Sequence, residues 1–347
     1  MIHEHFSNVM GQPPPRTVDI NWDALGFQQA DLSMLDQPFS EDEVLNAIQQ
    51  MPNDKALGPD GITMNFFKSC WGTIKHGVMA AIQAIFDQRC VNLHFINAAN
   101  IVLIPKKDGT DKVIDFCPIS LIHGMAKIIK KILVLRLAPK IGHIVSASQS
   151  AFIRGRNIHD NFLYVQNLAC RFHRNKTSAL LFKLDILKDF DSVRWDYLLR
   201  LMQGWGFPQR WRNWIATLLA SSTSLILLNG IEGDRIQHSR GLRQGDPLSP
   251  LLFILAIDPL QRLLNMATER GLLSKLRGRH AQLRTSMYAD DAIVFLNPKK
   301  DVSNLASILQ KFVLTSGLCT YFNKSSVIPI RCDNIDLDDI LENFPAT

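Results

Sequence analysis

The sequence lacks the patterns that mark a membrane, secreted or zinc-binding protein. It has no run of about 18 uninterrupted apolar residues, so no membrane-spanning helix and no membrane partner are predicted. Its first residues lack a charged segment followed by an apolar core, so no secretory signal is predicted. The six cysteines are scattered without a C-x₂-C pair, which excludes the usual zinc-ligand spacing and indicates reduced thiols. We therefore expect an intracellular protein.

Apolar residues make up 46% of the 347-residue chain, enough to bury the core of one large or two smaller domains. The net charge of +6 is unevenly distributed, because residues 61–330 hold 35 basic against 17 acidic side chains while both ends of the chain are acidic. A basic excess of this kind suits a polyanionic partner. A solvated basic face explains it equally well.

One tetrapeptide, Tyr288-Ala289-Asp290-Asp291, places two carboxylates side by side between two short runs, 284–287 and 292–296. The runs predict a β-hairpin with the acidic pair at its tip. Neighbouring like charges repel, and more strongly as water is removed. The pair is therefore either a solvated turn or a site for a hard divalent cation such as Mg²⁺, which takes carboxylate oxygens.

A third carboxylate, Asp185, closes the mostly apolar run 179–184, which predicts a buried strand that opens to a site at its C-terminal end. Such a carboxylate needs a partner. Asp189 and Asp191 follow closely, and either is typical of a helix cap. Asp185 is thus the candidate to join the hairpin pair around a cation.

Other segments predict elements around these residues. Ser40 and Glu43 predict a helix start. Residues 100–105 and 112–115 predict a hairpin with Lys106 and Lys107 at its tip, and 149–156 form a basic loop. A basic helix is predicted over 128–137, ended by Pro139. Residues 240–250 form a turn with glycines and arginines before an apolar helix at 251–264, where backbone amides can approach a phosphate or base.

Three blocks follow one another in the sequence: Asp185 before Phe190-Asp191, then Arg243-Gln244-Gly245-Asp246-Pro247-Leu248-Ser249-Pro250, then Tyr288-Ala289-Asp290-Asp291. In this order they resemble the reverse transcriptases of non-LTR (LINE-type) retrotransposons, most like plant copies. The resemblance runs from about residue 41 to 324 and includes the blocks 53–61, 115–121 and 149–160. The final tetrapeptide alone is a weak signal. Six blocks in the family's order are specific.

The resemblance implies an α+β fold, a right-hand polymerase with fingers and a ferredoxin-like palm sheet with packed helices, in which one carboxylate strand lies beside the acidic hairpin. It implies an N-terminal arm or linker at 1–40, fingers at 41–175, a palm at 176–330 with part of the fingers inserted, and an acidic tail at 331–347. Relatives usually continue into a thumb, which we do not find in the sequence and expect to be largely absent.

The implied activity is that of an RNA-directed DNA polymerase, which adds dNTPs to a DNA primer on an RNA template. Two Mg²⁺ ions, or Mn²⁺, would be held by Asp185, Asp290 and Asp291. Lys324 would be the general acid for pyrophosphate, and Phe190 would exclude a ribose 2′-hydroxyl. The basic middle of the chain would cradle an RNA–DNA hybrid. The remaining substrate-binding residues would be Arg243, Gln244, Gly245, Tyr288 and Lys106.

The sequence departs from the family at Leu57, Cys117, Leu187 and Asp189, where Pro, Arg, a small residue and Ala are usual. An Arg at 117 would hold the triphosphate with fixed donors that a thiol lacks. Asp189 adds a like charge close to Asp185. Our hypothesis is a truncated or decayed element copy, with a noncatalytic nucleic-acid-binding remnant as the alternative to an active enzyme. The element's presumed life cycle points to the nucleus, and no oligomeric state is indicated.

Overall fold

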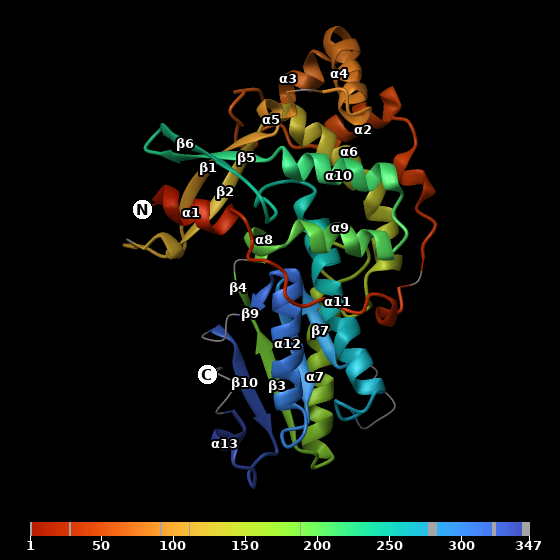
Figure 1. Ribbon diagram of the computed structural model, residues 1–347, viewed down its shortest axis with the longest axis vertical. Helices are drawn as coiled ribbons and strands as arrows, with labels where there is room; N and C mark the ends of the chain where they lie inside the picture. Colours follow the sequence, from red (N-terminus) through yellow and green to blue (C-terminus); the bar gives the residue numbers. More distant parts are fainter. Residues whose placement is uncertain are drawn as a thin grey trace. The chain divides into compact units, whose positions relative to one another are not determined.

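The computed structural model describes residues 2–27, 29–90, 92–110, 112–187, 189–276, 283–320 and 324–341 (Figure 1). Its fold is α+β, as the family resemblance predicts. The chain divides into two compact units: unit 1 contains residues 1–14, 30–140 and 205–252, and unit 2 contains 15–29, 141–204 and 253–347. The domain limits expected from the sequence stay a prediction.

Unit 1 is built on a four-stranded sheet in the order β2-β1-β5-β6. The strands are β1 (Ala98–Pro105), β2 (Phe116–Ile122), β5 (Thr223–Leu228) and β6 (Ile231–Gln237). β1 runs antiparallel to β2 and parallel to β5. The prediction of a strand at 112–115 was wrong, because Val113–Asp115 forms a 3₁₀ turn and the pairing with β1 begins only at Phe116, opposite Pro105.

Two helices of unit 1, α2 and α3, begin at a residue whose side chain caps the helix. Ser40 Oγ accepts the backbone N–H of Glu43 at 3.2 Å, which confirms the predicted start of α2. Pro139, however, lies inside a helix, so the prediction that it ends this helix was wrong. Leu137 and Ile141 on either side of it are fully buried, and such packing holds a helix in which proline removes one backbone donor. The helices are α2 (Glu41–Gln50), α3 (Met64–Ser69), α4 (Trp71–Phe86), α5 (Leu93–Ile96), α6 (Gly124–Ile144, which runs on into unit 2) and α10 (Gln209–Ala220).

A short helix lies near the start of the chain, within the predicted N-terminal arm. Residues Ile2–Met10 form helix α1, which packs on β6. Phe6 and Met10 recur every four residues on one face and are buried against Ile101 and Ile236. The apolar face of this short helix packs on the sheet, so residues 2–10 contribute to the core of unit 1.

Unit 2 is built on a second four-stranded sheet, in the order β10-β3-β8-β7, whose neighbours are all antiparallel. The side chains of Leu168 and Phe172 on α7 pack on one face, against Leu181 and Phe295. Helix α12 lies against the other face (Figure 1). The elements are α7 (Ile158–Arg174), β3 (Ala179–Leu184), β4 (Ile186–Leu187), α8 (Asp189–Ser192), α9 (Trp195–Gly204), β7 (Thr285–Tyr288), β8 (Asp291–Leu296), α12 (Val302–Ser316), β9 (Cys319–Thr320), β10 (Ser326–Ile330) and α13 (Leu337–Leu341).

Helix α11 (Ser249–Glu269) is the one helix in the described ranges that is long and apolar enough to cross a membrane. Of its most apolar stretch, 72% is buried inside the structure, as in the core helix of a globular protein. Its length and composition therefore reflect the packing of Phe253, Ile254 and their neighbours, all of which are fully buried.

Candidate active site

Adjacent strands bring three predicted carboxylates to one end of the unit 2 sheet. In the pairing of β3 with β8, Leu184 lies opposite Ala292, and the register continued by one residue sets Asp185 opposite Asp291. Tyr288 pairs with Asp291 across the hairpin, so Ala289 and Asp290 form its two-residue turn. The strand that leads to Asp185 thus lies beside the acidic hairpin, the arrangement that the resemblance implies.

Asp185 is at this edge because it follows directly on β3, which ends at Leu184. Leu180, Phe182 and Leu184 are fully buried on one face of the sheet, and the chain leaves the strand directly afterwards. The backbone N–H of Asp185 donates to the Oγ of the buried Ser325 at 3.2 Å. The carboxylate therefore stands on a fixed strand end.

The electrostatics of this edge are those of crowded acids. Burial raises the pKa of Asp185 above its ordinary value, and the charges of Asp290 and Asp291 raise it further, while Lys324 and Lys183 oppose the rise. Lys183 Nζ lies 3.5 Å from Asp291 Oδ1, with both side chains about half exposed. An exposed pair of this kind contributes little to stability. Three acids thus share one sheet edge, and the positive charges of Lys183 and Lys324 offset their mutual repulsion only in part.

The donor set fits a divalent metal. Carboxylate oxygens are the ligands that Mg²⁺ and Mn²⁺ prefer, and a cation opposes both the burial and the like charges that raise the pKa of Asp185. As the side chains are placed, no three His, Cys, Asp or Glu residues in the described part of the chain meet at metal-binding spacing. Binding would therefore require the carboxylates to turn about fixed strand ends.

Two aromatic residues predicted to bind substrate also belong to unit 2. Phe190, half-buried, stacks on Phe253 with 4.8 Å between ring centroids and an interplanar angle of 25°. Phe253 is fully buried on α11, so it fixes one face of the Phe190 ring. Tyr288, at the end of β7, is 40% exposed.

In unit 1, the turn after β6 is held against β2. The N–H of Ser120 donates to the carbonyl of Gln244 at 2.9 Å. Gly245 has φ of +92°, and a Cβ there would lie 2.9 Å from the carbonyl oxygen of Ser120, so only glycine suits this position. The Cys117 thiol donates to Gln244 Oε1 at 3.0 Å. The residue that departs most from the family thus contacts a predicted substrate-binding residue.

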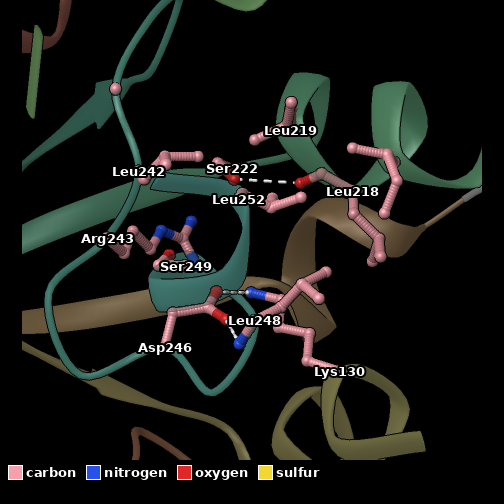
Figure 2. A pocket seen from close by; sticks show the side chains of 12 residues that line it. Lys130, Leu218, Leu219, Ser222, Leu242, Arg243, Asp246, Leu248, Ser249 and Leu252 are labelled. Atoms are coloured by element: carbon pink, nitrogen blue, oxygen red, sulfur yellow. Dashed lines mark hydrogen bonds and ion pairs between the residues drawn. The ribbon is translucent and has the colours of Figure 1, made fainter. Parts of the chain in front are cut away.

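A buried charged cluster lies beneath this turn (Figure 2). Asp246 accepts hydrogen bonds from Lys130 Nζ and, at 2.9 Å, from the N–H of Leu248. Lys130 Nζ also donates to Asn97 Oδ1 at 2.9 Å. Burial lowers the pKa of Lys130, and Asp246 opposes this change. Lys130 is 3% exposed and Asp246 is 8% exposed, so their charges stabilise each other rather than face solvent.

Arg243 belongs to the same cluster and points inward. Its guanidinium donates to the carbonyls of Asn97 at 2.6 Å and Thr223 at 2.9 Å, and the residue is 5% exposed. Burial lowers the pKa of Arg243 to about 10, with Asp246 opposing the change. Burial, together with Arg243 and Lys130, holds the pKa of His238 well below its usual value, so its imidazole is neutral at pH 7.

A cavity of about 20 Å³ lies beside this cluster, lined by Lys130, Arg243 and leucines of α10 and the turn (Figure 2). It has room for about one water molecule. The space next to Arg243 is therefore far too small for a nucleotide.

The structure brings together only part of the predicted site within each unit. Asp185, Asp290, Asp291 and Lys324 interact at one sheet edge of unit 2. In unit 1, Arg243, Gln244 and Gly245 share one turn, while the exposed Lys106 lies at the end of β1. The predicted roles stay predictions. Sequence reasoning missed Lys130, Asn97 and His238, and the only signal was a lysine within an apolar helical run.

Of the departures from the family, Leu57 is 42% exposed and Cys117 is half-buried. The side chains of Leu187 and Asp189 lie outside the described residues, so the predicted like-charge effect of Asp189 stays a prediction.

Comparison with known proteins gives a matching family model and similar proteins, including the following three. The family model described as "Reverse transcriptase (RNA-dependent DNA polymerase)" matches residues 104–333. The "Transposon TX1 uncharacterized 149 kDa protein" of Xenopus laevis is 29% identical over 92% of this chain, and the "Retrovirus-related Pol polyprotein from type-2 retrotransposable element R2DM" of Drosophila melanogaster is 27% identical over 79%. The matches cover 24% and 25% of these relatives, so the chain spans about a quarter of their length. An uncharacterized mitochondrial protein of Arabidopsis thaliana is 44% identical over 69 residues, which are 19% of this chain and 57% of that protein.

Proposed function

We propose that this chain, which belongs to the reverse transcriptase family, is the RNA-directed DNA polymerase segment of a non-LTR retrotransposon protein. The observation that carries the proposal is the pairing of β3 with the acidic hairpin, which sets Leu184, the residue before Asp185, opposite Ala292, the residue after Asp291, at one sheet edge. The proposed substrates are an RNA template, a DNA primer and dNTPs.

The family generally uses divalent metals, and the finer proposal is that Asp185, Asp290 and Asp291 hold two Mg²⁺ ions. When bound, such ions polarise phosphoryl oxygens and activate a hydroxyl nucleophile. The side chains of the protein supply the rest. Lys324, whose charge acts on Asp185, would deliver a proton to the leaving pyrophosphate. Phe190, held by Phe253, would clash with a ribose 2′-hydroxyl and so select deoxynucleotides.

A second candidate is a catalytically impaired remnant that still binds nucleic acid. Cys117 favours it, because the thiol donates to Gln244 and offers no fixed cationic donors to a triphosphate. The basic middle of the chain would bind phosphates with a steep dependence on salt in either case. A decayed plant element and a nuclear location belong to this proposal as well.

Primer extension on poly(rA)/oligo(dT) with Mg²⁺ tests both candidates. Asp290→Asn is expected to lower extension by about 10³-fold, the loss typical of removing a main electrostatic partner of a transition state. Asp234→Asn, which removes an exposed carboxylate on β6, is the matched control and should extend normally. If only Cys117→Arg extends, triphosphate binding has decayed. Binding of the hybrid without extension by any variant would support the remnant.

A further inference from the structure

The acidic hairpin has an unfavourable backbone at its tip. Ala289, the first residue of the turn, has φ of +54°, in the left-handed region that a Cβ disfavours. The residue is 7% exposed, and the two acids Asp290 and Asp291 follow it directly. The direction in which both carboxylates leave the turn therefore depends on a conformation that alanine adopts only when other contacts impose it.

The side chain of Gln149 makes those contacts. Its Oε1 accepts the N–H of Ala289 at 3.0 Å, and its Nε2 donates to the carbonyl of Ala289 at 3.3 Å. Both polar groups of the amide thus bind one residue, and Gln149 is fully buried. Paired buried hydrogen bonds of this kind are costly to lose, because each partner would be left without water.

Gln149 is itself fixed to the hairpin and to the chain behind it. The N–H of Ser150 donates to the carbonyl of Met287 at 3.1 Å, and the N–H of Met287 donates to the carbonyl of Ser148 at 2.8 Å. The guanidinium of Arg156 donates to the carbonyl of Gln149 at 2.7 Å. Gln149 therefore forms an isolated parallel bridge with Met287 of β7, and the amide has little freedom to follow the turn if the turn relaxes.

We propose that Gln149 is a positioning residue, which imposes the left-handed conformation on Ala289 and so aims Asp290 and Asp291 for metal binding and nucleotidyl transfer. The part that concerns nucleotidyl transfer rests on the proposed function. Without the amide, the turn gains a way to relax toward negative φ, which would redirect both carboxylates. Reactions that depend on positioned groups lose on the order of 10²-fold in rate for a displacement of about 1 Å.

The test compares Gln149→Leu in the natural chain and in the Ala289→Gly background. In the natural chain, kcat for primer extension is expected to fall on the order of 10²-fold with little change in the KM for dNTP. In the Ala289→Gly background the same substitution should cost at least several-fold less, because glycine reaches positive φ without a steric penalty. Equal losses in both backgrounds would overturn the proposal, since they would mean that Gln149 only fills space.

Gln261→Leu is the matched control. Gln261 is also a fully buried glutamine of unit 2, and its amide donates to Asn265 on α11 rather than to the hairpin. This substitution should change kcat equally little in both backgrounds. If Gln149→Leu does not fold, Gln149→Glu replaces it, because it keeps the size of the side chain but has no Nε2 donor.

Mn²⁺ affinity, measured by electron paramagnetic resonance without substrate, separates this proposal from the proposed function. Gln149→Leu should weaken Mn²⁺ binding, and Ala289→Gly should recover it in part, even if the natural chain extends no primer. Absence of extension with this Mn²⁺ pattern would contradict the polymerase alone. Mn²⁺ affinity that Gln149→Leu leaves unchanged would contradict the positioning role.

Discussion

The turn of unit 1 and the hairpin tip of unit 2 both carry charged residues of the family signature, yet they treat charge in opposite ways. Around the turn, Lys130, Arg243 and Asp246 are at most 8% exposed. Lys130 donates a hydrogen bond to Asp246, and Arg243 donates one to the backbone carbonyl of Asn97. At the hairpin tip, Asp291 is about half exposed, and burial together with like charges raises the pKa of Asp185.

The comparison distinguishes buried charges that fix the backbone around them from partly exposed charges that a cation would stabilise. A buried ion pair is costly to desolvate and remains only where geometry and further hydrogen bonds offset that cost, so it fixes the chain around it. Crowded, half-exposed acids gain from a cation that arrives from solution. Residues from one motif can therefore belong to either class, and Arg243 belongs to the first in this structure.

Removal of one carboxylate from each region should give the largest contrast. Asp246→Asn leaves Lys130 and Arg243 buried without their acid, so we expect the free energy of unfolding to fall by about 3–5 kcal/mol. Asp290→Asn removes a like charge and should change it by no more than about 1 kcal/mol, in the stabilising direction. Urea unfolding followed by circular dichroism measures both.

Asp234→Asn, on exposed strand β6, serves as the neutral reference for this pair. Equal losses for Asp246→Asn and Asp290→Asn would show that the acids at the hairpin tip are as tightly integrated as the buried cluster, and the distinction between the two regions would fail.

Phe190 of unit 2 tests whether a side chain can be packed and also contact substrate, because it stacks on Phe253 and is proposed to contact the nucleotide sugar. Phe190→Val should raise the use of rNTPs relative to dNTPs by about 10–200-fold, the range for differences in side-chain bulk within a pocket. Phe253→Leu, which removes the stacking partner, should have a weaker effect in the same direction, since an aromatic pair contributes about 0.5–1.5 kcal/mol. Competition between rATP and dATP during extension measures the ratio. An unchanged ratio in Phe190→Val would remove Phe190 from the proposed site.

Sequence patterns predicted the acidic hairpin and the strand that leads to Asp185, because a short apolar run and turn chemistry are local properties. They did not reveal the partners of Lys130. From sequence alone, a basic residue on a helix is expected to be solvated or to contact a phosphate. The burial of Lys130 depends on Asn97 and Asp246, which are distant in sequence. The role of Gln149 was equally hidden, since its amide meets Ala289 140 residues further along the chain. Pairings over such distances follow from tertiary structure alone.

The two regions should also respond to acid in opposite directions. The folded pKa of His238 is well below the unfolded value of about 6.5, so the neutral imidazole, packed near Lys130 and Arg243 and 2.8 Å from Ser224 Oγ, contributes stability above pH 6.5 that is lost as pH falls. The folded pKa of Asp185 is raised, so its contribution is fully present below about pH 4 and is lost as pH rises through the folded value.

Unfolding free energies of the natural chain, His238→Asn and Asp185→Asn between pH 4 and 7.5 isolate these two contributions. Below pH 6.5 the natural chain should lose up to about 1.4 kcal/mol per pH unit relative to His238→Asn, because one proton binds only the unfolded state. Relative to Asp185→Asn it should instead gain stability as pH falls toward 4. Mg²⁺ should reduce that second difference, since a bound cation stabilises the charged carboxylate against the burial and the like charges that raise the pKa of Asp185. Parallel curves for the two variants would mean that acid does not distinguish the buried cluster from the hairpin tip.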